Sequence, residues 1–204
     1  MKGFYSVKKM RKINKVFIII VGAIISFTII SSAQSRRDKR DQPEKLIDIA
    51  SVKPGMSIGE AGAGEGYFTF HLSRRVGEKG RIYANDIDKE ALQKLNNRCK
   101  LEGVKNIQTV LGEIADPCFP VTELDMVIML YAFHDFTEKE AWLKNVKKYM
   151  KDEANLMIFD GQDAHTGMSK ELVAELGGKA GFKLVRHTQL HNGIWIYILN
   201  LDQL

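Results

Sequence analysis

Apolar residues recur along the chain with two alternating spacings, from about residue 43 to the C-terminus. Apolar positions three or four residues apart predict helices, and short, nearly continuous apolar runs predict strands buried on both faces of a parallel sheet. Leu124–Leu130 is the clearest such run. The pattern predicts helices over residues 46–52, 67–76, 91–99, 141–150 and 168–180, and strands over residues 56–61, 82–84, 107–111, 124–130 and 155–159.

The last two apolar runs, residues 182–185 and 194–199, follow a different rule. They flank an Asn192-Gly193 turn signal and leave no room for a crossover helix. We therefore expect these two strands to pair antiparallel. Helices and strands that alternate and then end in such a pair define an α/β fold, a three-layer sandwich with helices on both faces of one sheet.

The N-terminal residues do not fit this pattern. Six basic residues and no acid lie within residues 1–15, and residues 16–30 are uncharged, as in a signal peptide or a membrane anchor. Small residues before the basic run favour cleavage after Ala33, whereas four basic residues within 36–40 favour an uncleaved anchor. We expect residues 1–33 to be a signal peptide or membrane anchor, residues 34–41 a basic linker, and residues 42–204 the folded domain.

The charge distribution and the cysteine content bear on where the domain is located and on which partners it can bind. The basic flank favours a membrane-anchored or exported domain on the periplasmic side over a cytoplasmic one. Of the 30 Lys and Arg residues, six lie in the N-terminal segment, which leaves 24 against 25 acids and a formal net charge of −1. A nucleic-acid partner is therefore not expected. Hydrophobic residues make up 45% of the chain, enough for a core, and Cys99 and Cys118 could form one disulfide or remain thiols.

The predicted strand, turn and helix around residue 62 carry the first chemical signal. Gly62, Gly64 and Gly66 permit a tight turn and let a ligand lie against the backbone, where a Cβ would collide. The N-terminus of the following helix would stabilise a carboxylate or phosphate there. Asp86 follows the last glycine by about twenty residues, after one helix and one strand, where a carboxylate can accept hydrogen bonds from ribose hydroxyls.

The segment Glu60-Ala-Gly-Ala-Gly-Glu-Gly66, together with Asp86, is similar to the first and second motifs of class I S-adenosylmethionine-dependent methyltransferases. The spacing differs from the Gly-x-Gly-x-x-Gly of nicotinamide enzymes, so a dehydrogenase is the less favoured interpretation. The resemblance covers roughly residues 42–201 and implies a Rossmann-like sandwich whose mostly parallel seven-stranded sheet has an antiparallel C-terminal strand. It implies that S-adenosyl-L-methionine is the cofactor, bound by Glu60, Ala61, Gly62, Gly64, Gly66, Asp86, Ile87 and Leu130, with Glu113 and Ile114 at its adenine.

Ligands of open α/β sheets bind beyond the carboxyl ends of the strands, which directs attention to residues 131–136 and Asp160. His134 beside Asp135 could orient a nucleophile or take its proton, so these two residues are the catalytic candidates. The alternative is that Asp135 caps the helix that begins at residue 137 or 138 and that His134 only packs. Similarly, Glu113 could be a solvated loop carboxylate. No Cys/His spacing matches a zinc site, so no metal is expected.

The resemblance therefore predicts a methyltransferase that acts on an unidentified acceptor, for which a small molecule is favoured. Methyl transfer is a displacement on an activated sulfonium, so holding the acceptor close can supply much of the acceleration without an obvious base. The alternative is a non-catalytic nucleotide- or partner-binding module of the same fold, tethered to the membrane or exported. The membrane is a partner only if the N-terminal segment stays uncleaved, and the pattern does not set the oligomeric state.

Overall fold

The computed structural model describes residues 34–161, 168–190 and 193–202. The chain divides into two compact units, Met1–Gln42 and Pro43–Leu204. In the first unit, the predicted basic linker at residues 34–41 is helical. The predicted signal peptide or anchor, residues 1–33, lies outside the described residues. Among the helices of the described ranges, none has the length and apolar character needed to cross a membrane.

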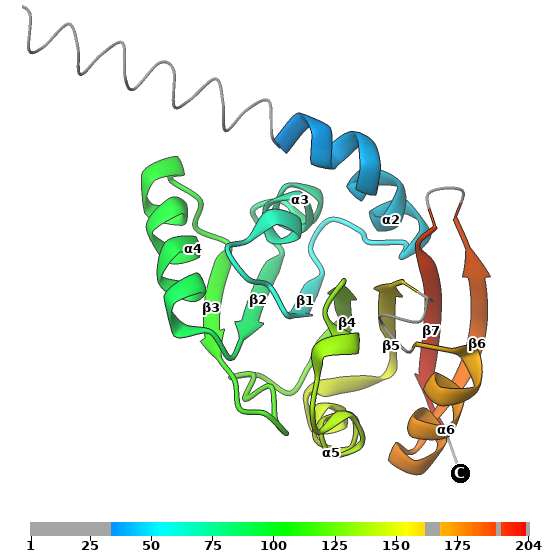
Figure 1. Cartoon of the computed structure of the whole chain (residues 1–204). Coiled ribbons are helices and arrows are strands. Elements are labelled where there is room, and N and C mark those ends of the chain that lie inside the picture. The colour runs from blue at the N-terminus through cyan, green and yellow to red at the C-terminus, as the bar shows by residue number, and fades with distance from the viewer. Residues whose placement is uncertain (1–33, 162–167, 191–192, 203–204) are drawn as a thin grey trace, which may run out of the picture. The chain divides into compact units, whose positions relative to one another are not determined.

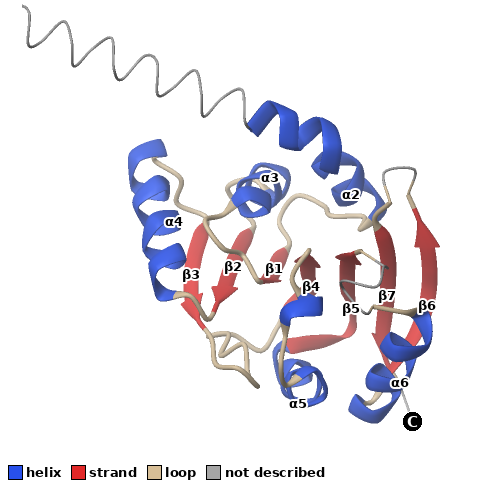
Figure 2. Cartoon of the chain, in the orientation of Figure 1, coloured by secondary structure: helices blue, strands red, loops and turns tan. Residues whose placement is uncertain are grey.

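The second unit is built on a single seven-stranded sheet (Figures 1 and 2). Its strands are β1 (Ser57–Ala61), β2 (Arg81–Asp86), β3 (Ile107–Leu111), β4 (Leu124–Leu130), β5 (Met150–Asp160), β6 (Phe182–Gln189) and β7 (Trp195–Leu201). They lie in the order β3-β2-β1-β4-β5-β7-β6. Strands β1 to β5 pair in parallel, whereas β7 runs antiparallel to both β5 and β6. The predicted mostly parallel sheet with an antiparallel C-terminal strand is confirmed.

Helices cover both faces of this sheet, as Figure 1 shows. On one face lie α2 (Pro43–Ile49), α3 (Tyr67–Val76) and α4 (Lys89–Glu102), and on the other lie α5 (Lys139–Val146) and α6 (Lys170–Ala180). Successive side chains of a strand point to opposite faces. In β4, for example, Ile128 packs in the core beside α2 and α3, and Met129 packs in the core beside α5 and α6. The predicted three-layer sandwich is therefore confirmed.

Two predicted boundaries were wrong in the region between α5 and β5. The helix predicted over residues 141–150 ends at Val146, a 3-10 turn follows at Lys147–Tyr149, and β5 already begins at Met150. The predicted strand 155–159 is only the C-terminal half of β5. The first half carries the polar run Lys-Asp-Glu at residues 151–153, which has no apolar alternation, and Lys151 pairs with Asp125 at the start of β4.

The strand order places a crevice where chemistry can occur. The chain moves outward from β1 to β2 and β3 in one direction and from β4 to β5 in the other, so the order reverses between β1 and β4. Connections on either side of such a reversal diverge and leave a crevice beyond the carboxyl ends of the strands. The glycine-rich turn after β1 and the residues that follow β2, β3 and β4 all reach this edge.

Candidate cofactor-binding and methyl-transfer site

The three glycines of the turn after β1 have different tasks. All of them have positive φ, of 76°, 53° and 90° for Gly62, Gly64 and Gly66. A Cβ on Gly62 would lie 2.2 Å from the Cβ of Ala132, and one on Gly66 would lie 2.3 Å from Cδ1 of Leu95. A Cβ on Gly64 would meet no atom within 4 Å in the described part of the chain. Gly62 and Gly66 therefore let the turn pack against the protein, and Gly64 alone leaves backbone facing open space.

Asp86, at the end of β2, holds the turn. The backbone N–H of Gly64 donates to Asp86 Oδ2 at 2.7 Å, and the N–H of Asp88 donates to Oδ1 at 2.9 Å. A second link joins the N–H of Ala63 to the carbonyl of Asn85 at 2.9 Å. Each carboxylate oxygen has further acceptor capacity, so Asp86 can also accept from ligand hydroxyls.

Glu60, the acid that precedes the turn, is buried. Only 2% of the residue is exposed, and its Oε2 has no hydrogen-bond partner among the described residues. Burial raises the pKa of Glu60 from 4.5 to about 8, and the charge of Asp86 adds to this shift. Because a buried charge needs compensation, a cationic ligand group beside Glu60 would stabilise its ionised form. This unpartnered carboxyl oxygen and the open space at Gly64 fit a ligand that carries an ammonium group.

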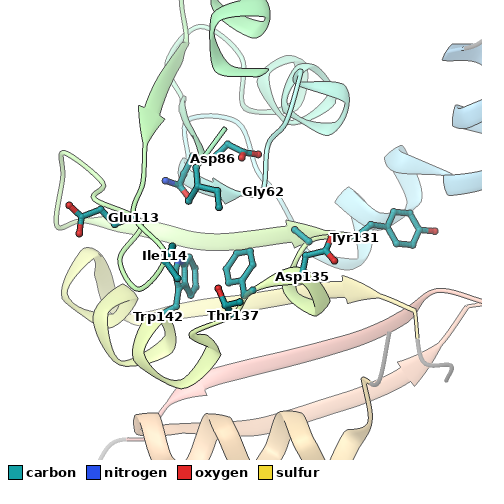
Figure 3. A pocket seen from close by; sticks show the side chains of 12 residues that line it. Gly62, Asp86, Glu113, Ile114, Tyr131, Asp135, Thr137 and Trp142 are labelled. Carbon is teal, nitrogen blue, oxygen red and sulfur yellow. The ribbon is translucent and has the colours of Figure 1, made fainter. Parts of the chain in front are cut away.

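A cleft opens next to the turn at the carboxyl ends of β1 to β4 (Figure 3). Two large apolar side chains that line the cleft are exposed to solvent: Ile87 is 62% exposed and Ile114 is 55% exposed. Exposed apolar groups beside a cleft indicate a ligand surface. The lining residues are Gly62, Asn85, Asp86, Ile87, Glu113, Ile114, Tyr131, Ala132, Asp135, Phe136, Thr137 and Trp142.

The cleft includes some of the predicted cofactor residues and not others. Gly62, Asp86, Ile87, Glu113 and Ile114 line it. Glu60, Gly64 and Gly66 are not among its lining residues, and Ala61 and Leu130 are buried in the core on either side of the sheet. In Figure 3 the Glu113 carboxylate lies on the outside of its loop, and the Tyr131 side chain points away from the other labelled residues. Trp142, on α5, was not predicted, because its helical spacing gives no sign that one edge of its buried ring reaches a cleft.

The loop after β3 that carries Ile114 is held on both sides. The Asn85 side chain donates to the carbonyl of Pro117 at 2.8 Å, and the Asn145 side chain on α5 donates to the carbonyl of Ala115 at 2.9 Å. The Tyr149 hydroxyl donates to Asp116 Oδ1 at 2.7 Å. These bonds hold the loop that carries Ile114, which lines the cleft together with Ile87, so this part of the cleft is preformed.

His134 pairs with a residue other than the predicted one. Its Nδ1 lies 2.8 Å from Asp160 Oδ1, and its backbone N–H donates to Asp160 Oδ2 at 3.0 Å. Asp160, the last residue of β5, is fully buried. Burial raises the pKa of the Asp160 carboxyl, and His134 partly offsets this shift. Asp135 is farther from the other ring nitrogen, since its Oδ2 lies 3.4 Å from His134 Nε2.

The helix-capping alternative for Asp135 was wrong. Helix α5 begins at Lys139, its N-cap residue is Glu138, and no side chain among the described residues caps it. Asp135 instead lies in the 3-10 turn Phe133–Asp135, with 81% of its side chain exposed. The two cysteines, left open by the sequence, are both free thiols: Cys99 is buried in α4 and Cys118 lies in the loop before β4.

A glycine-rich turn, an acid at the end of the second strand and a cleft at the switch point are typical of Rossmann-like proteins that bind a nucleotide-containing cofactor. The model of the methyltransferase domain family matches residues 52–196, so the chain belongs to that family. A relative is the ubiquinone/menaquinone biosynthesis C-methyltransferase UbiE of Vibrio cholerae, which is 26% identical over 159 residues, 78% of this chain and 61% of the relative. The chain thus spans about 61% of the length of that relative.

Solved structures agree with the family. A SAM-dependent methyltransferase from Aquifex aeolicus is 26% identical, with a TM-score of 0.72 over 77% of this chain and 88% of that one. A TehB-like SAM-dependent methyltransferase from Corynebacterium glutamicum shares the fold, with a TM-score of 0.62 at 17% identity over 78% and 86% of the two chains. These likenesses agree with membership of the methyltransferase domain family, and the non-catalytic alternative is not favoured.

Proposed function

We propose that the protein transfers the methyl group of S-adenosylmethionine to a small protic acceptor and that His134 takes the proton the acceptor loses. The observation that carries this proposal is the pairing of the buried Asp160 with His134, which is next in the chain to Asp135, a residue that lines the cofactor cleft. The bound cofactor would supply a methyl group on a sulfonium. The sulfur leaves as a neutral thioether, which is a good leaving group.

Different residues around the cleft would bind different parts of the cofactor. Asp86 would accept hydrogen bonds from the ribose hydroxyls, and Ile87 and Ile114 would cover the adenine. Glu60 would face the methionine ammonium group, because its buried Oε2 lacks a partner among the described residues. Open space at Gly64 supports the approach of the cofactor to the backbone of the turn.

The proton assignment follows from how His134 is held. A carboxylate can only accept, so the short contact between Asp160 Oδ1 and Nδ1 places a proton on Nδ1. Nε2 of the neutral ring then carries the free electron pair and can accept a proton. When the acceptor attacks, its bond to the methyl carbon forms, the carbon–sulfur bond breaks with its electrons going to sulfur, and the acceptor proton moves to Nε2. Asp160 stabilises the resulting imidazolium.

A reduced quinone ring is our candidate acceptor. The UbiE relatives are named for C-methylation in ubiquinone and menaquinone biosynthesis, and a hydroquinone is small, flat and protic. Aromatic side chains that line the cleft support this choice, since Phe136 and Trp142 form an edge-to-face pair with centroids 5.1 Å apart.

The experiment is transfer of a radiolabelled methyl group by the full chain to a reduced naphthoquinone, a simple phenol and a primary amine, with Asp86→Ala as the control. We expect label in at least one small molecule, the reduced naphthoquinone first, and none with the control. Label that enters only protein or nucleic acid would contradict a small-molecule acceptor.

We also propose that the N-terminal segment, residues 1–33, directs the domain to the membrane or across it. The basic residues followed by an uncharged run support this role. Fractionation of cells that express the full chain or a chain without residues 1–33 tests it. We expect only the full chain to be exported or to remain with alkali-washed membranes, and an unprocessed full chain in the soluble fraction would contradict the proposal.

A further inference from the structure

Lys139, the first residue of α5, makes two contacts that the functions described so far do not use. Its Nζ donates to the carbonyl of His134 at 2.8 Å and to the carbonyl of Phe136 at 2.5 Å. These carbonyls belong to the turn that joins β4 to α5 and carries His134 and Asp135. The side chain of Lys139 therefore ties the start of α5 to the middle of this turn.

Together, Lys139 and Asp160 hold nearly every polar group of His134. Asp160 accepts from the backbone N–H and pairs with Nδ1, and Lys139 donates to the backbone carbonyl. Nε2 is then the ring atom outside these bonds, and it lies 3.4 Å from the carboxylate of Asp135, a residue that lines the cleft. The two holding residues come from different elements, β5 and α5, so Asp160 holds the ring and Lys139 holds the backbone of His134.

Helix stability does not explain a lysine at this position. The N-terminus of a helix carries partial positive charge, which disfavours a cation in the first turn. Burial also lowers the pKa of the Lys139 ammonium group, although Asp135 and Asp160 oppose this shift. Lys144 shows the usual arrangement on the same helix, because it lies in the last turn, is exposed and pairs with Glu140 at 2.6 Å.

We propose that Lys139 is a positioning residue of the methyl-transfer site, which fixes the turn so that His134 presents Nε2 to the cleft. This inference rests on the proposed role of His134. The charged groups around the imidazole are Asp160 from β5, Asp135 from the same turn and Lys139 from α5. Of these, Lys139 alone bonds the backbone on the C-terminal side of His134.

The test compares Lys139→Met with Lys144→Met, which removes an ammonium group from the exposed side of the same helix. The readout is the solvent exchange rate of the His134 Nδ1 proton, followed by nitrogen-15 NMR of the full chain. Loss of charged hydrogen bonds should speed this exchange at least about tenfold in Lys139→Met. Loss of an exposed ion pair should change it by less than about twofold in Lys144→Met.

Lys139→Arg keeps the charge and the donors, so its exchange rate for the His134 Nδ1 proton should be close to that of the wild type. This variant tests the inference even if Lys139→Met folds poorly. Equal exchange in wild type and Lys139→Met, or a wild-type ring protonated on Nε2 instead of Nδ1, would overturn the inference. The readout needs no methyl acceptor. Binding of S-adenosylhomocysteine to the same samples separates a failure of the proposed function from a failure of this inference.

Discussion

Glu60→Gln tests the electrostatics of the cofactor turn directly. The folded chain holds a proton on Glu60 up to a pKa of about 8, because burial disfavours the charge, whereas the unfolded chain releases it near 4.5. Between these two values the folded state binds more protons than the unfolded state. The stability that this group contributes is therefore complete below pH 4.5 and falls as pH rises to 8, by about 1.4 kcal/mol per pH unit. Glutamine does not titrate and lacks this dependence.

The free energy of unfolding of Glu60→Gln, relative to wild type, should therefore rise by roughly 2 to 3 kcal/mol between pH 5.5 and pH 7.5. Urea denaturation at the two pH values measures this difference. Glu65→Gln, in the same turn, is the matched control, because Glu65 is 64% exposed and pairs with Lys94 at the surface. A difference for Glu60→Gln that stays constant with pH would show that Glu60 ionises normally and would refute the reasoning.

Three further changes have distinct expected results. Gly64→Ala should weaken S-adenosylhomocysteine binding in calorimetric titration while lowering the free energy of unfolding by only about 1 kcal/mol, the cost of a positive φ without a clash. Gly62→Ala should lower it by about 3 kcal/mol in urea denaturation, because its Cβ would overlap that of Ala132; equal losses at the two glycines would contradict their separate tasks. Asp160→Asn should reduce kcat for the reduced naphthoquinone by about a hundredfold or more, as expected when a proton acceptor takes the wrong tautomer, and should leave cofactor affinity unchanged. An Asp160→Asn variant with unchanged kcat would exclude the proton assignment.

The sequence predicted those parts of the fold that depend on local pattern. β3 and β4 have the predicted bounds, and α3 begins at Tyr67 directly after the last glycine of the turn. The antiparallel end of the sheet was predicted from the short connection between two apolar runs, and the register of β6 with β7 confirms it. The strand predicted for β5 was too short, because the first half of β5 is polar and shows no apolar alternation.

The site was harder to predict, because its contacts join residues far apart in the chain. The pairing of His134 with Asp160 spans 26 residues, so sequence adjacency pointed to Asp135 instead. One signal was available: Asp160 is at the carboxyl end of β5, His134 follows the carboxyl end of β4, and these two strands are neighbours in the sheet. The separate tasks of Gly62, Gly64 and Gly66 had no such signal, since they depend on which atoms lie beside each turn position.

The measurement that most directly tests the central claim is calorimetric titration of the full chain with S-adenosylmethionine and S-adenosylhomocysteine, with Asp86→Ala as the comparison. We expect micromolar binding of both ligands to the wild type and none to Asp86→Ala, because this carboxylate both accepts from the Gly64 N–H of the turn and lines the cleft. A folded wild-type chain that binds neither ligand, or an Asp86→Ala variant that binds as tightly as the wild type, would contradict the account of this site.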